Sequence, residues 1–118
     1  MSQSYSNIDV DESEDQVAAF AVDVNWLHVI NKSAAILYLK LYNGTAADVV
    51  VGTTTPQHTF PIPAQADANG GGFTINLRDG IQFRTALSIA ATTGIAVADT
   101  GAPAANDVTV NLGYDLHI

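Results

Sequence analysis

The chain has 118 residues, no cysteine, and 12 acidic against 4 basic side chains, which gives a formal charge of −8. This length suits one domain, and the absence of cysteine excludes disulfides and thiolate metal sites. Because phosphate binding needs clustered lysine and arginine, the charge argues against nucleic acid as a direct partner. No apolar run approaches membrane-spanning length and the N-terminus does not resemble a signal peptide, so we expect no membrane partner.

The first 16 residues are polar and acidic, which predicts a flexible arm, separate from a folded domain over residues 17–118. Five carboxylates lie close together in this arm: Asp9, Asp11, Glu12, Glu14 and Asp15. They offer oxygen ligands for calcium but lack the glycine and the terminal glutamate of an EF-hand loop. We therefore predict no metal site, and an arm that either stays solvated or orders on a partner. In the second case Asp11, Glu12, Glu14 and Asp15 would contact that partner.

From residue 17 onward, short segments typical of β-strands are joined by Gly, Asn and Asp turns. The expected strands are 17–24, 26–30, 34–42, 45–51, 57–62, 73–78, 81–91 and 108–118, with loops at 65–72 and 92–107. Asn43-Gly44 and Asp79-Gly80 each predict a two-residue hairpin turn. Seven or eight short strands without a convincing helical pattern predict an all-β antiparallel sandwich of the jelly-roll kind.

Segment 34–42 is unusual because both of its faces are apolar. One face carries three leucines, and the other carries Ile36, Tyr38 and Tyr42. A strand of an antiparallel sandwich normally keeps one face in water. We therefore expect the leucines in the core, and Ile36, Tyr38 and Tyr42 beneath a neighbouring subunit or a folded-over N-terminal segment.

No motif in the chain points to catalysis. His28, His58 and His117 are too far apart in sequence for a metal-binding motif, and Ser88 has no nucleophile elbow around it. The glycines at 70–72 are followed by a strand pattern and by no lysine, unlike a phosphate-binding loop. We predict no catalytic residue, no metal and no cofactor, and a protein that is not an enzyme.

Residues 80–94 read GIQFRTALSIAATTG, and residues 98–114 read ADTGAPAANDVTVNLGY. These segments resemble small virion or prophage proteins of tailed bacteriophages. Residues 39–43 (LKLYN), Pro56 and residues 60–63 (FPIP) are similar to the same group, whereas the acidic arm lies outside the resemblance. The resemblance is structural and carries no catalytic residue.

The resemblance implies a virion structural protein that is made in the host cytoplasm and decorates or cements the head. Its partners would be the major capsid protein and further copies of itself, in a homotrimer. A body poor in charge and a strand with two apolar faces agree with a subunit that assembles on a larger lattice. The alternative is a receptor- or glycan-binding head domain of a tail or head fibre, which would use Trp26 or Tyr114 and the 92–107 loop.

Overall fold

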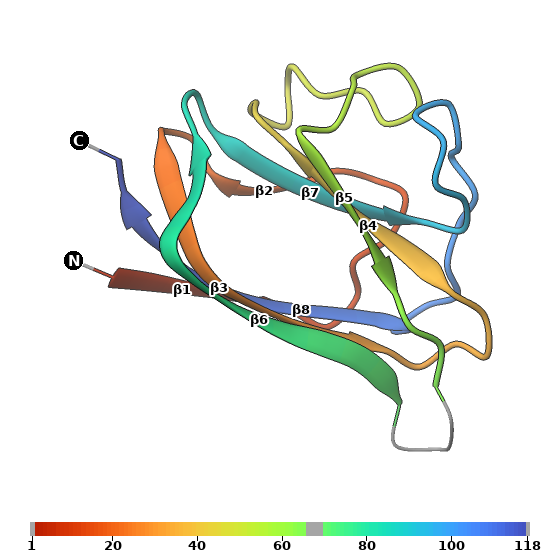
Figure 1. Ribbon diagram of the computed structural model, residues 1–118. Coiled ribbons are helices and arrows are strands. Elements are labelled where there is room, and N and C mark those ends of the chain that lie inside the picture. The colour runs from red at the N-terminus through yellow and green to blue at the C-terminus, as the bar shows by residue number, and fades with distance from the viewer. Residues whose placement is uncertain (1, 66–69, 118) are drawn as a thin grey trace.

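The computed structural model describes residues 2–65 and 70–117, which form eight strands and no helix. The strands are β1 (Ser2–Asn7), β2 (Asp15–Ala18), β3 (Val22–Asn31), β4 (Leu37–Tyr42), β5 (His58–Ile62), β6 (Gly71–Phe83), β7 (Leu87–Thr92) and β8 (Val108–Leu116). They form two four-stranded antiparallel sheets packed face to face, sheet A in the order β1-β8-β3-β6 and sheet B in the order β2-β7-β4-β5 (Figure 1). The prediction of an all-β antiparallel sandwich is confirmed.

The hydrophobic core lies between the two sheets and follows the two-residue alternation of the strands. Its side chains include Val22, Val24, Leu27 and Val29 of β3, Leu37, Leu39 and Leu41 of β4, Leu87 and Ile89 of β7, and Val108, Val110 and Leu112 of β8. The three leucines of β4 therefore lie where the alternation predicts. Strand β8 confirms the alternation expected near the C-terminus.

Sheet B is buried on its outer side as well, because loops of the same chain cover it. All six residues of β7 are buried, and the Tyr42 side chain on β4 is 0% exposed. Val49 and Val51 from the 43–57 loop pack against Tyr42 and Ala90, and this loop lies over the outer side of the sheet (Figure 1). The expected burial on both faces is real, but for Tyr42 the covering atoms belong to the chain itself and not to another subunit.

A second loop is held over sheet B by a buried lysine. The Lys40 side chain, on β4, is fully buried, and its Nζ donates hydrogen bonds to the carbonyl oxygens of Ala96 (2.8 Å) and Asp99 (3.2 Å). Burial lowers the pKa of the Lys40 amine, and the Asp99 carboxylate partly offsets this effect. Because a buried cation without acceptors is strongly unfavourable, these two bonds fix the 93–107 loop on the sheet.

Neither predicted two-residue hairpin forms. After Asn43 the chain makes two successive turns in place of a strand at 45–51, with backbone hydrogen bonds from Val49 N to Thr45 O and from Thr54 N to Val50 O. The Asn43 side chain accepts a hydrogen bond from the backbone N–H of Thr85 at 2.8 Å. It thus joins the end of β4 to the connection before β7 and does not turn the chain back on itself.

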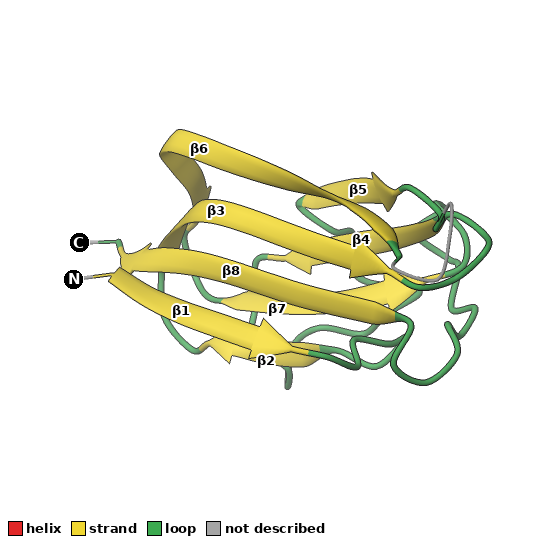
Figure 2. Cartoon of the chain, turned by 90° about the horizontal axis from the view of Figure 1, so that it is seen from below, coloured by secondary structure: helices red, strands yellow, loops and turns green. Residues whose placement is uncertain are grey.

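Asp79-Gly80 lies inside the continuous strand β6, at a large irregularity. Residues 77–80 of β6 stand opposite the single residue Asn25 of β3, since the pairing passes from Trp26↔Asn76 to Val24↔Ile81. Gly80 has a φ of +78°, a conformation that suits a bulge as well as a turn. Strand β6 curls at this point (Figure 2).

The N-terminal segment is not the flexible arm that its composition predicts. Strand β1 pairs with β8 at the edge of sheet A, and β2 begins at Asp15 on sheet B. Between them Val10 is 1% exposed, its N–H donates to Val108 O (3.0 Å), and Asp11 O accepts from Ala91 N (2.7 Å). A strand added to a sheet edge is held by backbone hydrogen bonds, so it needs few apolar side chains. The segment therefore closes one side of the sandwich.

Replacing Val10 by Asp is expected to lower the free energy of unfolding by at least about 2 kcal/mol, because it places a carboxylate in the core. The control is Ile8→Asp, since Ile8 is 65% exposed and belongs to the same segment. This control should change stability by no more than about 0.5 kcal/mol. Urea unfolding measures both, and equal midpoints for the two variants would mean that the segment is detached.

Candidate binding surfaces

Sheet A leaves its outer face open, and Figure 2 views the molecule from that side. The strand registers place the outward-pointing residues in rows that cross β1, β8, β3 and β6 in turn. The two central rows are Ser4–Gly113–Trp26–Asn76 and Ser6–Asn111–His28–Thr74. We call these eight residues the polar face.

Hydrogen bonds order the side chains of the second row. Ser6 Oγ donates to Asn111 Oδ1 at 2.6 Å, and His28 Nδ1 lies 2.6 Å from Thr74 Oγ1. Both contacts join neighbouring strands at exposed positions. These contacts restrict the rotation of four polar side chains that remain accessible to solvent.

Trp26 lies at the centre of the polar face, over the backbone of Gly113. A Cβ atom at residue 113 would stand 2.0 Å from Trp26 Nε1 and 2.6 Å from two neighbouring ring atoms, so only glycine leaves room for the indole. The Trp26 side chain is partly exposed. Tyr114, the other aromatic residue of the expected glycan site, points to the inner side and packs against the core. The 93–107 loop is bonded to sheet B, so the structure does not unite the parts of that expected site.

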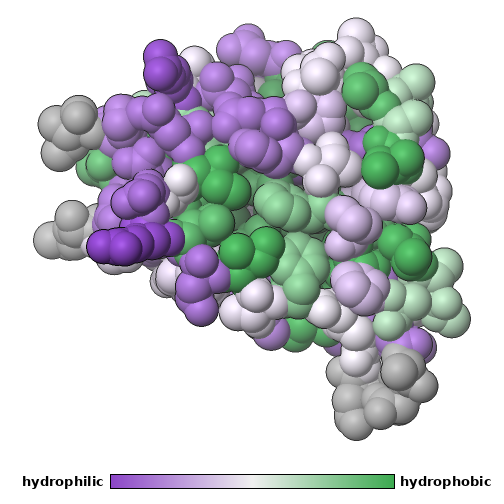
Figure 3. Space-filling model, in the orientation of Figure 1, coloured by the Kyte–Doolittle hydropathy of each residue, from purple (hydrophilic) through white to green (hydrophobic). Residues whose placement is uncertain are grey.

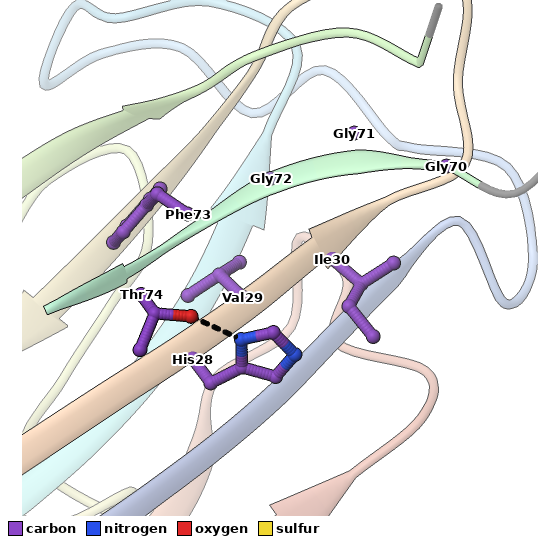
Figure 4. A pocket seen from close by; sticks show the side chains of 8 residues that line it. All are labelled: His28, Val29, Ile30, Gly70, Gly71, Gly72, Phe73 and Thr74. Atoms are coloured by element: carbon purple, nitrogen blue, oxygen red, sulfur yellow. Dashed lines mark hydrogen bonds between the residues drawn. The ribbon is translucent and has the colours of Figure 1, made fainter. Parts of the chain in front are cut away.

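A hollow of about 480 Å³ adjoins the polar face where β3 ends and β6 begins (Figure 4). Its lining residues are His28, Val29, Ile30, Gly70, Gly71, Gly72, Phe73 and Thr74. Gly72 has a φ of +139° and lies so close to β3 that a Cβ would overlap the carbonyl oxygen of Val29. Of the loop expected at 65–72, residues 66–69 lie outside the described residues, and residues 71 and 72 already belong to β6.

A second surface lies where the edge strands β5 and β6 face each other across the sandwich. A groove of about 250 Å³ runs between them, lined by Phe60, Pro61, Pro63, Phe73 and Ile75. The rings of Phe60 and Phe73 are 5.8 Å apart between centroids. Figure 3 shows apolar surface between the two layers on this side of the molecule. We call these five residues the apolar groove.

In the acidic segment between β1 and β2, Asp11 stabilises a local turn and Asp9 binds the distant 93–107 loop. Asp9 Oδ1 accepts from Asn106 N (2.8 Å), and Asp11 Oδ1 accepts from Ser13 N (2.9 Å). Burial raises the pKa of Asp15, and Asp11 is the strongest of the nearby carboxylates that raise it further, while a hydrogen bond from Asn7 opposes the shift. Among residues 2–65 and 70–117, no three His, Asp or Glu side chains are placed to hold a metal ion.

The three histidines lie in separate places. His28 belongs to the polar face, and the His58 ring stacks on Phe60 with centroids 6.2 Å apart. His117 Nδ1 lies 3.0 Å from Asp23 Oδ2 near the C-terminus. The fold therefore does not assemble them into one site.

The predicted interface residues of β4 differ in exposure. Ile36, just before the strand, is 50% exposed, Tyr38 is partly exposed, and Tyr42 is buried as described above. Only Ile36 and Tyr38 are available to a partner.

No protein-family model, no curated protein and no solved structure matches this chain. In the described part of the chain, no helix is long and apolar enough to cross a membrane. What the protein does therefore has to be inferred from its own surfaces.

Replacing Asp15 by Asn is expected to stabilise the fold at neutral pH, by less than about 1 kcal/mol. A carboxyl group whose pKa is raised by folding favours the folded state below its unfolded pKa and loses that contribution as the pH rises through the folded pKa. The charge on Asp15 therefore costs stability at pH 7, whereas the amide oxygen of the replacement side chain can still accept the hydrogen bond from Asn7.

Thermal unfolding at pH 7 and at pH 3 measures this effect. The variant should melt above the wild type at pH 7, and the difference should shrink at pH 3, where Asp15 is protonated in both states of the wild type. A gain that is equal at both pH values would contradict the electrostatic explanation.

Proposed function

We propose that this chain is a bacteriophage virion structural protein, a capsid decoration or cement protein that binds the head surface and stabilises it. It acts by attachment and not by catalysis. The observation that carries the proposal is the apolar groove between the free edges of β5 and β6. The resemblance of residues 80–94 and 98–114 to tailed-phage virion proteins supplies the biological setting.

The edge of β6 suits the addition of a further strand. It is 13 residues long and, among the described residues, pairs with β3 alone. Its other edge therefore offers backbone groups to a further strand, except at Gln82, whose carbonyl oxygen accepts a hydrogen bond from Gln57 Nε2 at 2.8 Å. Natural sheets usually protect such edges with lysines, prolines or covering loops. An extended segment of the major capsid protein that pairs with β6 would place an apolar side chain in the groove, beside Phe60 and Phe73.

Low charge supports attachment through a neutral surface. Only 14% of the residues are charged, and the apolar groove itself carries no charged side chain. The cores of protein interfaces are likewise depleted in charge and enriched in aromatic residues. The acidic residues Asp11, Glu12 and Glu14 lie between β1 and β2, which are the opposite edges of the two sheets.

We also propose that the chain forms a homotrimer, and the support for this step is the resemblance to tailed-phage virion proteins alone. Ile36 and Tyr38 are its proposed subunit contacts because they are the exposed apolar residues at the start of β4. The carboxylates of Asp11, Glu12 and Glu14 are proposed to meet basic residues of a neighbouring subunit or of the capsid.

Mass spectrometry of virions made from the genome that encodes this chain tests the proposal. A decoration protein should be present in a copy number comparable with that of the major capsid protein. Absence from purified virions would overturn the proposal, and a copy number far below that of the capsid protein would favour a fibre component.

Binding to particles that lack the chain then tests the groove. Pro61→Glu adds a charge to an exposed residue of the groove without removing a backbone N–H, and it should weaken binding at least tenfold, which is about 1.4 kcal/mol. Ala47→Glu is the matched control, because it adds the same charge to an exposed turn over sheet B and should bind as the wild type. Equal affinity of the two variants would exclude the groove as the contact.

A further inference from the structure

We propose that the polar face of sheet A binds an uncharged saccharide, with one sugar ring stacked on Trp26. This inference does not depend on the proposed attachment to a capsid, because the polar face and the apolar groove have no residue in common, and the hollow beside the polar face shares only Phe73 with the groove. It goes beyond that function by assigning a ligand class to a second surface.

The first argument is the way in which Trp26 is held. Its indole lies over Gly113, where a Cβ would overlap the ring, so the backbone of β8 supports the aromatic group from below. The side chain remains partly exposed. A large aromatic ring that is already positioned loses little conformational freedom when a ligand stacks on it. The C–H groups on one face of a pyranose form a flat apolar surface that matches such a ring.

The second argument is the chemistry that surrounds the indole. Asn76 lies in the same row as Trp26, and the next row holds the amide of Asn111, the hydroxyls of Ser6 and Thr74, and the imidazole of His28. Amide, hydroxyl and imidazole groups can each donate and accept hydrogen bonds. Sugar hydroxyls have the same dual character. The contacts Ser6–Asn111 and His28–Thr74 hold these groups in place before a ligand arrives.

The third argument is charge. The chain carries a formal charge of −8, yet the polar face contains no carboxylate, ammonium or guanidinium group. The neighbouring row on the Ser4 side contains Asp23 and Asp115, and both carboxylates form hydrogen bonds or ion pairs, Asp23 with His117 (3.0 Å) and Asp115 with Asn25 (2.8 Å). The neighbouring row on the other side holds Thr109, Ile30 and Gly72 and carries no charge. These eight residues offer an anionic polymer no cationic partner, and the next cation along β6 is the exposed Arg78, two residues beyond Asn76. An uncharged polar ligand matches it.

The hollow beside His28 and Thr74 provides room for more of the ligand. It has a volume of about 480 Å³ and opens next to the second row of the polar face. Figure 4 shows the His28 ring bonded to Thr74 through one nitrogen, while its other nitrogen points away from Thr74. A saccharide longer than one unit could therefore stack on Trp26 and extend over His28.

The test uses Trp26 as its own reporter, because it is the single tryptophan of the chain. The wild-type protein is titrated with uncharged oligosaccharides (cellohexaose, xylohexaose, mannohexaose, maltohexaose and chitohexaose), and with heparin as a charged comparison. We expect a saturable change in tryptophan emission with at least one uncharged oligosaccharide and none with heparin. No saturable change with any of the uncharged sugars, or saturation by heparin alone, would overturn the proposal.

Variants then locate the binding site by calorimetry with the sugar that binds. Trp26→Ala and His28→Ala should each weaken binding at least tenfold, and circular dichroism checks that both remain folded. Should Trp26→Ala fail to fold, His28→Ala decides alone, because His28 is a partly exposed residue outside the core. Pro61→Glu, in the apolar groove, should bind the sugar as the wild type does. Unchanged affinity in a folded His28→Ala or Trp26→Ala variant would contradict the assignment.

The two proposals fail separately. Loss of sugar binding in these variants with normal attachment to particles would leave the capsid proposal intact. Loss of particle binding in Pro61→Glu with normal sugar binding would leave the saccharide site intact.

Discussion

The buried ammonium group of Lys40 is the constraint on which the arrangement of sheet B depends. A cation inside a protein must find acceptors, and here these are the carbonyl oxygens of Ala96 and Asp99. The 93–107 loop is therefore held over β4. If it extended into solvent, the Lys40 ammonium group would either become exposed or stay buried without hydrogen-bond acceptors. Together with Val49 and Val51 of the 43–57 loop, the 93–107 loop closes the outer side of the sheet.

Because loops cover the outer side of sheet B, the two sheets present different surfaces to solvent. On sheet B the covering loops bury β7 and most of β4, whereas Tyr38 at the start of β4 stays partly exposed. The buried parts of these strands cannot bind a partner directly. Sheet A keeps an open outer face with Trp26 at its centre, and the free edges of β5 and β6 leave an apolar groove at the side. Two surfaces of different chemistry, one polar and uncharged and one apolar, are thus available on a scaffold with a radius of gyration of 13.3 Å.

The sequence predicts those parts of the fold that depend on side-chain alternation. Leu37, Leu39 and Leu41 lie in the core, and the strand expected from residue 108 onward forms, because burial of one face leaves a period of two in the sequence. The segment expected at 57–62 forms the edge strand β5, a position where Pro61 is tolerated. The sequence does not predict strand β1, because pairing along a sheet edge depends on backbone groups that every residue carries. The hairpin turn predicted at Asp79-Gly80 is wrong, because a glycine with positive φ suits a bulge as well as a turn.

The candidate sites were less predictable, since they depend on contacts between distant segments. The sequence identifies Trp26 as an aromatic residue able to stack on a sugar, but the position of its indole over Gly113 depends on the strand register. A glycine inside the alternating segment 108–116 is the one local signal of such a close approach. Likewise, the apolar character of Tyr42 indicates burial, but not whether a loop or another subunit provides the cover.

Acylation of the two lysines in the dilute, monomeric chain tests most directly whether the chain covers its own sheet B. Lys32 is exposed and serves as the internal reference, whereas Lys40 is fully buried. Mass spectrometry after brief treatment with an amine-reactive reagent should find Lys32 modified and Lys40 protected, with Lys40 reacting only as fast as the protein unfolds. If Lys40 reacted as fast as Lys32 in the monomer and became protected only when subunits associate, the cover would come from a partner, contrary to the structure described above.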